Sequence, residues 1–272
     1  MWLPFAIWGA IKLSWRPFRP SAPSQKLPLL AALYLIAPLV LGGVCWFEES
    51  TFATYGFSFQ ATLFVSMVQG LAAGSLGLLA MFWLESALGW LTWDLSLAVP
   101  KRANLKPICW LLLLGLWVGW TEELIFRGFL QTQLEQIPFW SQNLTWITEK
   151  LSQEMVAIWG TATANSLFFA LLHWVWEGQS IVAQLPGLWL MGMVLVLARQ
   201  ADGGNIGLAW GLHAGWIWAI ASLETLQLIH YTGKAPSWLT GHNDKPLAGI
   251  IGLGFLLLTA SGLFTICAGS YF

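Results

Sequence analysis

The strongest constraint on the fold of this chain is a series of seven long apolar runs separated by short polar segments. A transmembrane α-helix needs roughly 20 predominantly apolar residues, and most of these runs are about that long. Only 9% of the residues are charged, whereas soluble domains carry about 25% charged residues. The sequence therefore predicts an all-α, polytopic transmembrane helix bundle. Its runs lie at about 27–46, 58–84, 108–131, 157–176, 184–199, 205–223 and 247–268.

The segments between the runs predict surface structure. Residues 1–15 combine Trp and Phe with basic side chains, which predicts an interfacial helix too short to span, and residues 16–26 form a basic linker. Residues 85–98 are apolar but contain Glu85 and Asp94, which predicts an interfacial or re-entrant helix. The bundle therefore has seven spans, or eight if this segment inserts. The polar stretch 132–154 predicts a loop with surface helices.

The distribution of charge predicts the orientation and excludes one class of partner. Lys and Arg gather at 16–26, 101–106 and 234–245, which seven spans would place on one side of the membrane. By the positive-inside rule that side is cytoplasmic, which predicts a cytoplasmic N-terminus. We expect a multi-pass protein, and a bacterial cell membrane as its location. The formal net charge of -1 excludes a basic nucleic-acid-binding surface.

The third apolar run contains three ionisable residues within the sequence T-E-E-L-I-F-R-G. They are Glu122, Glu123 and Arg127. Each charge inside a bilayer costs roughly 2.5–3.5 kcal/mol on insertion scales, and such residues usually mark functional sites. Glu123 and Arg127 are spaced i, i+4 and can pair on one helix face. Glu122 is rotated by about 100° from Glu123, so its carboxylate is expected to remain available.

Two histidines lie deep in other apolar runs. His173 follows the sequence N-S-L-F-F-A-L-L, and His213 lies within G-L-A-W-G-L-H-A-G. A single membrane histidine is usually a hydrogen-bonding residue between helices, but two histidines and two carboxylates on three spans favour a functional site. We therefore expect a polar intramembrane pocket among the third, fourth and sixth spans. Asn165, two turns before His173, is interpreted as a hydrogen bond between helices.

Two kinds of chemistry fit these residues. A carboxylate shielded from water becomes a better general base near neutral pH, and a histidine beside it can help to polarise a water molecule for attack on an amide. Alternatively, Glu and His could bind a divalent metal, and His173 and Glu177 are suitably spaced at i, i+4. The chain contains no H-E-x-x-H sequence, so the metal-dependent hydrolase is the minority interpretation.

The order and spacing of these motifs resemble the CPBP family, which is also called the Abi family. It comprises CAAX prenyl endopeptidases of the Ras-converting type, bacteriocin-processing proteins and self-immunity proteins. The resemblance rests on E-E-x-x-x-R at Glu122–Arg127, F-x-x-x-H at Phe169–His173 and the later His213, and it covers about 108–223. It implies a glutamate-dependent intramembrane endopeptidase that needs no metal or cofactor for its chemistry.

The resemblance also implies a role for each site residue. Glu122 with His173 would activate the water, while Glu123 and Arg127 would shape the site and hold the substrate. His213 would help to form the oxyanion hole. Phe169 matches an aromatic position and is expected to pack rather than react.

The chain departs from the family pattern after His213. The third motif often reads H-x-x-x-N or H-x-x-x-D, but the corresponding residue here is Ile217, which cannot donate a hydrogen bond. Trp216 or Trp218 could offer an indole N–H instead. Loss of one oxyanion donor typically lowers the rate on the order of 10²–10³-fold, so this departure qualifies the predicted activity.

The sequence thus predicts hydrolysis of a peptide bond in a membrane-associated protein or peptide, lipidated substrates included. One alternative is a non-proteolytic membrane scaffold or bacteriocin self-immunity protein that keeps the pocket; the other is a metal-dependent membrane hydrolase. The expected partners are the substrate and the lipid bilayer. We divide the chain into an N-terminal segment 1–26, a transmembrane region 27–106, a catalytic core 107–223 and a C-terminal loop and helix 224–272.

Overall fold

The fold is known from a computed structural model, which describes residues 23–94, 106–137 and 152–270, together with 8, 11–12, 14 and 16–19. The side chains of 23–33 and 268–270 are not described. Residues 8, 11 and 12 are helical, in agreement with the helix predicted over 1–15. Ser14 lies in a turn. The other residues of 1–15, the basic residues Lys101 and Arg102, and residues 138–151 of the predicted polar loop fall outside the described part.

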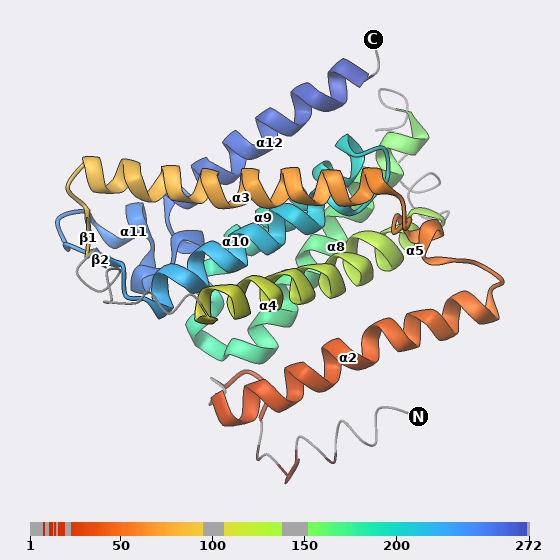
Figure 1. Cartoon of the computed structure of the whole chain (residues 1–272), viewed down its shortest axis with the longest axis horizontal. Helices are drawn as coiled ribbons and strands as arrows, with labels where there is room; N and C mark the ends of the chain where they lie inside the picture. Colours follow the sequence, from red (N-terminus) through yellow and green to blue (C-terminus); the bar gives the residue numbers. More distant parts are fainter. Residues whose placement is uncertain are drawn as a thin grey trace.

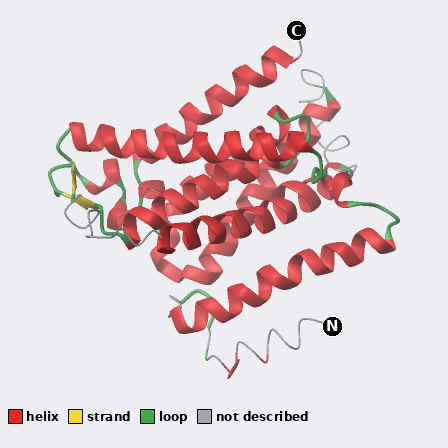
Figure 2. Cartoon of the chain, viewed as in Figure 1, coloured by secondary structure: helices red, strands yellow, loops and turns green. Residues whose placement is uncertain are grey.

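Each predicted apolar run forms a long helix, and helices make up nearly all of the regular structure (Figure 2). The long helices are α2 (Pro23–Phe47), α3 (Ala61–Ala87), α4 (Lys106–Glu123), α8 (Gln153–Glu177), α9 (Leu185–Ala201), α10 (Gly207–Thr225) and α12 (Ile250–Ser270). Short helices join them: η1 (Phe52–Tyr55), the π-helix η2 (Leu124–Leu130), α5 (Gln131–Glu135), η3 (Gly178–Gln184), α11 (Ser237–Thr240), η4 (His242–Asp244) and η5 (Pro246–Ala248).

The helices confirm the prediction of an all-α membrane bundle. Four helical segments of the described chain are long and apolar enough to cross a membrane: Ala61–Ala87, Lys106–Glu135, Gln153–Ala201 and Ile250–Cys267. The third of these contains α8, η3 and α9 in one continuous run. The predicted count of seven or eight spans stays a prediction, because length and composition alone single out these four.

The segment 85–98 differs from its prediction. Helix α3 continues to Ala87, and the chain then turns at Gly89, whose φ of 72° is readily adopted only by glycine. Strand β1 (Leu91–Trp93) follows and pairs antiparallel with β2 (Ile229–Tyr231), with Leu91 opposite Tyr231. The interfacial or re-entrant helix is therefore wrong for 91–93, where aromatic and β-branched side chains favour a strand. Residues 95–98 lie outside the described part.

Helix α10 lies at the centre of the bundle, between α3, α4 and α9 (Figure 1). Glycines allow its close approach to α3: a Cβ on Gly211 would lie 2.0 Å from the carbonyl oxygen of Met67, and one on Gly70 would lie 2.4 Å from that of Leu208. On the side of α4, the indole of Trp210 donates to the carbonyl of Leu116 over 2.8 Å. The backbone of α10, and with it the position of His213, is therefore tightly fixed.

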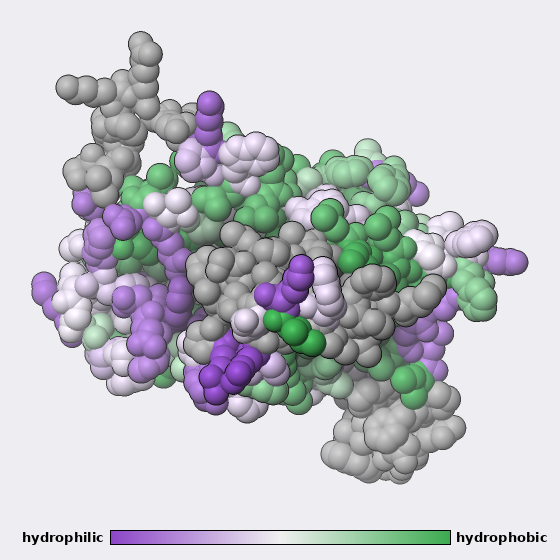
Figure 3. Space-filling view, turned by 90° about the horizontal axis from the view of Figure 1, so that it is seen from below, coloured by the Kyte–Doolittle hydropathy of each residue, from purple (hydrophilic) through white to green (hydrophobic). Residues whose placement is uncertain are grey.

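Helix α2 lies along the outside of the bundle, beside α4 and η2 (Figure 1). Viewed from that side, hydrophobic side chains cover broad areas of the surface, and hydrophilic side chains gather toward the end that carries β1 and β2 (Figure 3). A broad apolar surface is consistent with a bundle that faces lipid. The position of α2 also makes it one wall of the cavity described next.

Candidate active site

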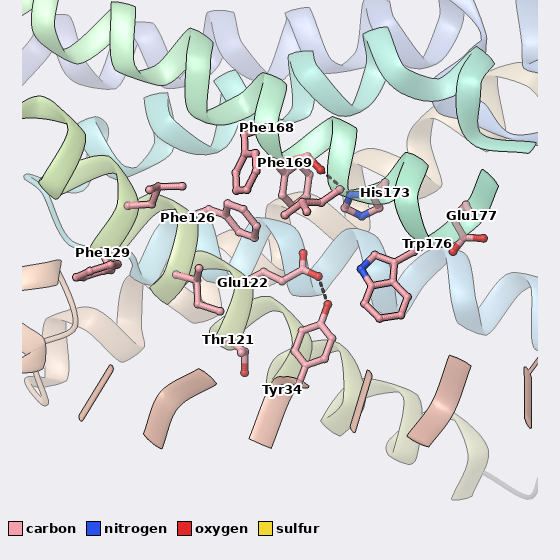
Figure 4. Close-up of a pocket in the computed structure, with 13 residues that line it drawn as sticks. Tyr34, Thr121, Glu122, Phe126, Phe129, Phe168, Phe169, His173, Trp176 and Glu177 are labelled. Carbon is pink, nitrogen blue, oxygen red and sulfur yellow. Dashed lines mark hydrogen bonds between the residues drawn. The ribbon is translucent and has the colours of Figure 1, made fainter. Parts of the chain in front are cut away.

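A cavity of about 470 Å³ lies between α2, α4 with η2, and α8 (Figure 4). Its walls are mainly apolar and aromatic, and a few polar side chains project from three different helices. The polar residues that line it are Tyr34, Thr121, Glu122, His173 and Glu177, and the apolar ones are Ile125, Phe126, Phe129, Leu130, Phe168, Phe169, Leu172 and Trp176. Such a mixture is typical of a site that orients an apolar ligand through a few polar contacts.

Glu122 presents its carboxylate to this cavity. The hydroxyl of Tyr34, which comes from α2, donates a hydrogen bond to Oε1 of Glu122 (Figure 4). The other oxygen, Oε2, lies 3.6 Å from Nε2 of His213. Glu122 is only 9% exposed, so its carboxylate is held largely away from solvent between groups from α2 and α10.

Glu123 points away from the cavity into the bundle. Its Oε1 lies 3.1 Å from Nη1 of Arg127 and 2.7 Å from Nδ1 of His213, and none of the three residues is more than 4% exposed. The contact with the Arg127 guanidinium, which is always a donor, identifies Glu123 as the acidic partner of a buried ion pair. The expected pairing of Glu123 with Arg127 and the separate direction of Glu122 are both present.

The segment after Glu123 is a π-helix rather than the continuous α-helix that an i, i+4 spacing assumes. Nδ2 of Asn165 donates to the carbonyl of Phe126 over 2.7 Å and to Oε1 of Gln131 over 3.2 Å. Asn165 is therefore a hydrogen-bonding residue between helices, as its position predicted. In a π-helix the backbone hydrogen bonds join residues five apart rather than four apart, and short π-helical segments often occur at functional sites.

His173 lines the cavity from α8. Its Nδ1 lies 2.9 Å from the carbonyl oxygen of Phe169, which can only accept, so Nδ1 carries the proton. In the neutral ring Nε2 is then left as a proton acceptor. Glu122 and His173 thus line one cavity from different helices, as the water-activating pair requires, and no direct contact joins them (Figure 4).

Phe169 joins the two halves of the site by packing, as expected for this position. It is 1% exposed, and its ring lies 4.6 Å from the centroid of the His173 ring. The guanidinium carbon of Arg127 lies 4.6 Å from the centroid of the Phe169 ring, which is a cation–π contact. The ring of Phe169 therefore separates the buried ion pair from the cavity.

His213 lies against both glutamates rather than alone. Because Nδ1 contacts the carboxylate that Glu123 shares with Arg127, a neutral His213 ring would have its proton on Nδ1 and an acceptor at Nε2, which faces Glu122. The neutral ring cannot donate to an oxyanion; only the imidazolium form has a proton at Nε2. The predicted role of His213 in an oxyanion hole therefore requires the protonated ring.

None of the residues near the missing family position reaches the cavity. Ile217 packs against α4, where its Cγ2 would lie 3.6 Å from a Cβ on Gly115. The indole of Trp218 donates to the carbonyl of Ile108 over 3.1 Å, and Trp216 packs against Phe255 of α12. The suggestion that either tryptophan supplies the missing donor is therefore wrong, because α10 turns both indoles away.

The cavity residue that was not predicted from the sequence is Tyr34, which donates to Glu122. It is the only hydroxyl-bearing residue in the run 27–46, and a hydroxyl in such a run was the available signal. Nothing in the sequence relates α2 to α4, so its partner could not be read from the pattern.

The described residues contain no group of three or more His, Cys, Asp or Glu side chains in a metal-binding arrangement. His173 and Glu177, the pair considered for a metal, both line the cavity.

Comparison with known proteins identifies the domain that contains this site. Residues 104–219 match the family model described as type II CAAX prenyl endopeptidase Rce1-like, a range that includes all five predicted site residues. Neither a curated protein nor a solved structure matches the chain. The match confirms the family resemblance, and with the apolar helices it identifies a membrane protein. Residues 104–219 of this chain are therefore a domain of the Rce1-like type II CAAX prenyl endopeptidase family.

Proposed function

We propose that the protein is an intramembrane endopeptidase in which Glu122, assisted by His173, activates a water molecule for attack on a peptide bond. The observation that carries the proposal is that these two residues line one largely apolar cavity from separate helices. A carboxylate that is 9% exposed is poorly hydrated, which favours its action as a general base. The acceptor nitrogen Nε2 of His173 can accept a second hydrogen bond from the same water molecule.

The buried group of Glu123, Arg127 and His213 has a supporting role in this proposal. Arg127 neutralises Glu123, and Glu123 holds His213 through its Nδ1 proton. The Nε2 atom of His213 then faces Oε2 of Glu122 at 3.6 Å, where it can share a proton with that carboxylate. A histidine oriented by a carboxylate is a common arrangement for proton transfer.

The substrate in this proposal is a membrane-associated protein or peptide, lipidated ones included. The cavity offers eight apolar side chains around its few polar groups, which suits a segment with an apolar or lipidated portion. Helix α2, which contributes Tyr34 to one wall of the cavity, lies along the outside of the bundle (Figure 1), where lipid would surround it. The cytoplasmic N-terminus, the bacterial membrane and the chain divisions given above stay predictions.

The test uses the full chain in liposomes and a quenched fluorescent peptide that ends in a farnesylated CAAX sequence. Glu122→Ala and His173→Ala are each expected to abolish cleavage while leaving the thermal unfolding midpoint near that of the wild type. Glu224→Gln is the control, because it removes a carboxylate from an exposed pair with Lys245, remote from the cavity lining. Undiminished cleavage by both cavity variants would rule out the proposed water activation.

If no peptide is cleaved by the wild type, while Glu123→Ala still prevents folding, the non-proteolytic scaffold becomes the better account. If a chelator abolishes cleavage and Zn²⁺ restores it, the metal-dependent hydrolase becomes the better account. Both outcomes can be read in the same liposome assay.

A further inference from the structure

Hydrolysis of a peptide bond by this site needs a donor for the carbonyl oxygen that becomes negatively charged. Neither Ile217 nor the tryptophans beside it reach the cavity, and His173 and His213 can donate from Nε2 only in their protonated forms, because Nδ1 of each ring is bound to another acceptor. Removal of one such donor from a protease typically lowers the rate on the order of 10²–10³-fold. A site that lacked one entirely would be severely impaired.

Tyr34 provides a donor at the required place. It lines the cavity from α2, and its hydroxyl contacts Oε1 of Glu122, the carboxylate beside which the attacking water must lie (Figure 4). A carbonyl under attack lies about 3 Å from that water, and an oxyanion donor must lie within hydrogen-bonding distance of the same carbonyl. The hydroxyl of Tyr34, which is bound to Glu122, therefore lies near the position expected for the carbonyl oxygen of a bound substrate.

We propose that the hydroxyl of Tyr34 donates the hydrogen bond that stabilises the tetrahedral oxyanion, and so replaces the polar residue that is absent at Ile217. The inference rests on the proposed function of Glu122. In the step, the water oxygen bonds to the carbonyl carbon, its proton passes to Glu122, and the π electrons of the C=O bond move to the oxygen. Collapse re-forms the C=O bond and breaks the C–N bond, and the amine nitrogen takes the proton from Glu122.

Proton transfer to Glu122 favours a shift of the Tyr34 hydrogen bond from the carboxylate to the oxyanion. Before the step, the ionised carboxylate of Glu122 is the stronger acceptor and holds the hydroxyl. Once Glu122 has taken the proton it is neutral, and the oxyanion is the stronger acceptor. The hydroxyl therefore binds the transition state better than the ground state, which is the condition for raising kcat rather than lowering KM.

Two other cavity residues carry donors and must be distinguished from Tyr34. The hydroxyl of Thr121 points away from the carboxylate of Glu122 (Figure 4). The indole N–H of Trp176 points toward the region of that carboxylate, so Trp176 is the rival donor (Figure 4). Tyr34 is favoured because its hydroxyl already contacts Glu122.

The experiment compares Tyr34→Phe, Trp176→Phe and Glu122→Ala in the full chain in liposomes, with the farnesylated peptide as substrate. Tyr55→Phe is the matched control, because Tyr55 also donates to a glutamate, Glu48 at 2.7 Å, but lies outside the cavity lining. A phosphinic peptide of the same sequence serves as the tetrahedral mimic, and its affinity is measured beside that of the uncleaved substrate.

Tyr34→Phe is expected to lower kcat on the order of 10²–10³-fold with little change in KM, and to lower the affinity for the phosphinic peptide by a similar factor. Tyr55→Phe should retain the wild-type kcat and the wild-type affinity for the phosphinic peptide. Tyr34→Phe and Tyr55→Phe should both unfold near the wild-type temperature.

The inference is overturned if Tyr34→Phe keeps the wild-type kcat while Glu122→Ala is inactive, or if Trp176→Phe alone loses activity. It is also overturned if Tyr34→Phe is faster, since Tyr34 would then be an inhibitory cap. A fall in kcat with unchanged phosphinic-peptide affinity assigns Tyr34 to positioning Glu122 and likewise overturns the oxyanion role. If Glu122→Ala remains active, the proposed function itself fails.

Discussion

The contact between α3 and α10 allows a quantitative test of how the fold positions the site. A Cβ on Gly211 would lie 2.0 Å from the carbonyl oxygen of Met67 and 2.7 Å from the amide nitrogen of Leu71, whereas ordinary contacts begin at 3.4 Å. Gly211→Ala therefore forces the two backbones apart by roughly 1 Å or more, at a cost of about 1–3 kcal/mol in unfolding free energy.

This displacement acts on His213, which is only two residues further along α10. Its 2.7 Å contact with Glu123 and its 3.6 Å approach to Glu122 both depend on the spacing of α10 and α4. Since misplacement of a catalytic group by 1 Å can lower a rate about 10²-fold, Gly211→Ala should lose about that factor in kcat.

The assay is cleavage of the farnesylated peptide in liposomes, with thermal unfolding followed by tryptophan fluorescence. Gly262→Ala is the matched control, because a Cβ at that position of α12 meets nothing within 4 Å. The control should be active and at least as stable as the wild type, since alanine is favoured over glycine inside a helix by about 1 kcal/mol. Equal behaviour of the two variants in both measurements would refute the argument from helix spacing.

Three further substitutions test the surroundings of the site. Arg127→Met leaves Glu123 buried without its cation and should destabilise the fold by about 3–5 kcal/mol in chemical denaturation, whereas a small effect would show that the ion pair is dispensable. Asn165→Leu removes the donor to the π-helix and should cost about 1–3 kcal/mol with reduced kcat; unchanged values of both would contradict this role. Ile217→Asn faces Gly115 rather than the cavity, so it should give no gain in kcat, and a clear gain would show that this position reaches the substrate.

The chemistry of the site could be predicted only in part from the sequence. The divergence of Glu122 and Glu123 follows from their adjacency on one helix, and the pairing of Glu123 with Arg127 follows from their spacing, because both are local relations. The π-helix was not predicted, because it depends on Asn165 of α8 holding the carbonyl of Phe126. The strand at 91–93 was missed for the same reason, since its partner β2 comes more than a hundred residues later.

The helices, the membrane character and the family of residues 104–219 could be predicted from the sequence, because hydropathy, helical spacing and short motifs are properties of neighbouring residues. Which side chains contact one another depends on how the helices pack. The tertiary structure brought His213 against both glutamates, left His173 on the cavity wall and turned Ile217 toward Gly115. It also placed Tyr34 on Glu122. These contacts join helices distant in the chain, and their geometry is set by how closely the backbones of α3, α4 and α10 can approach.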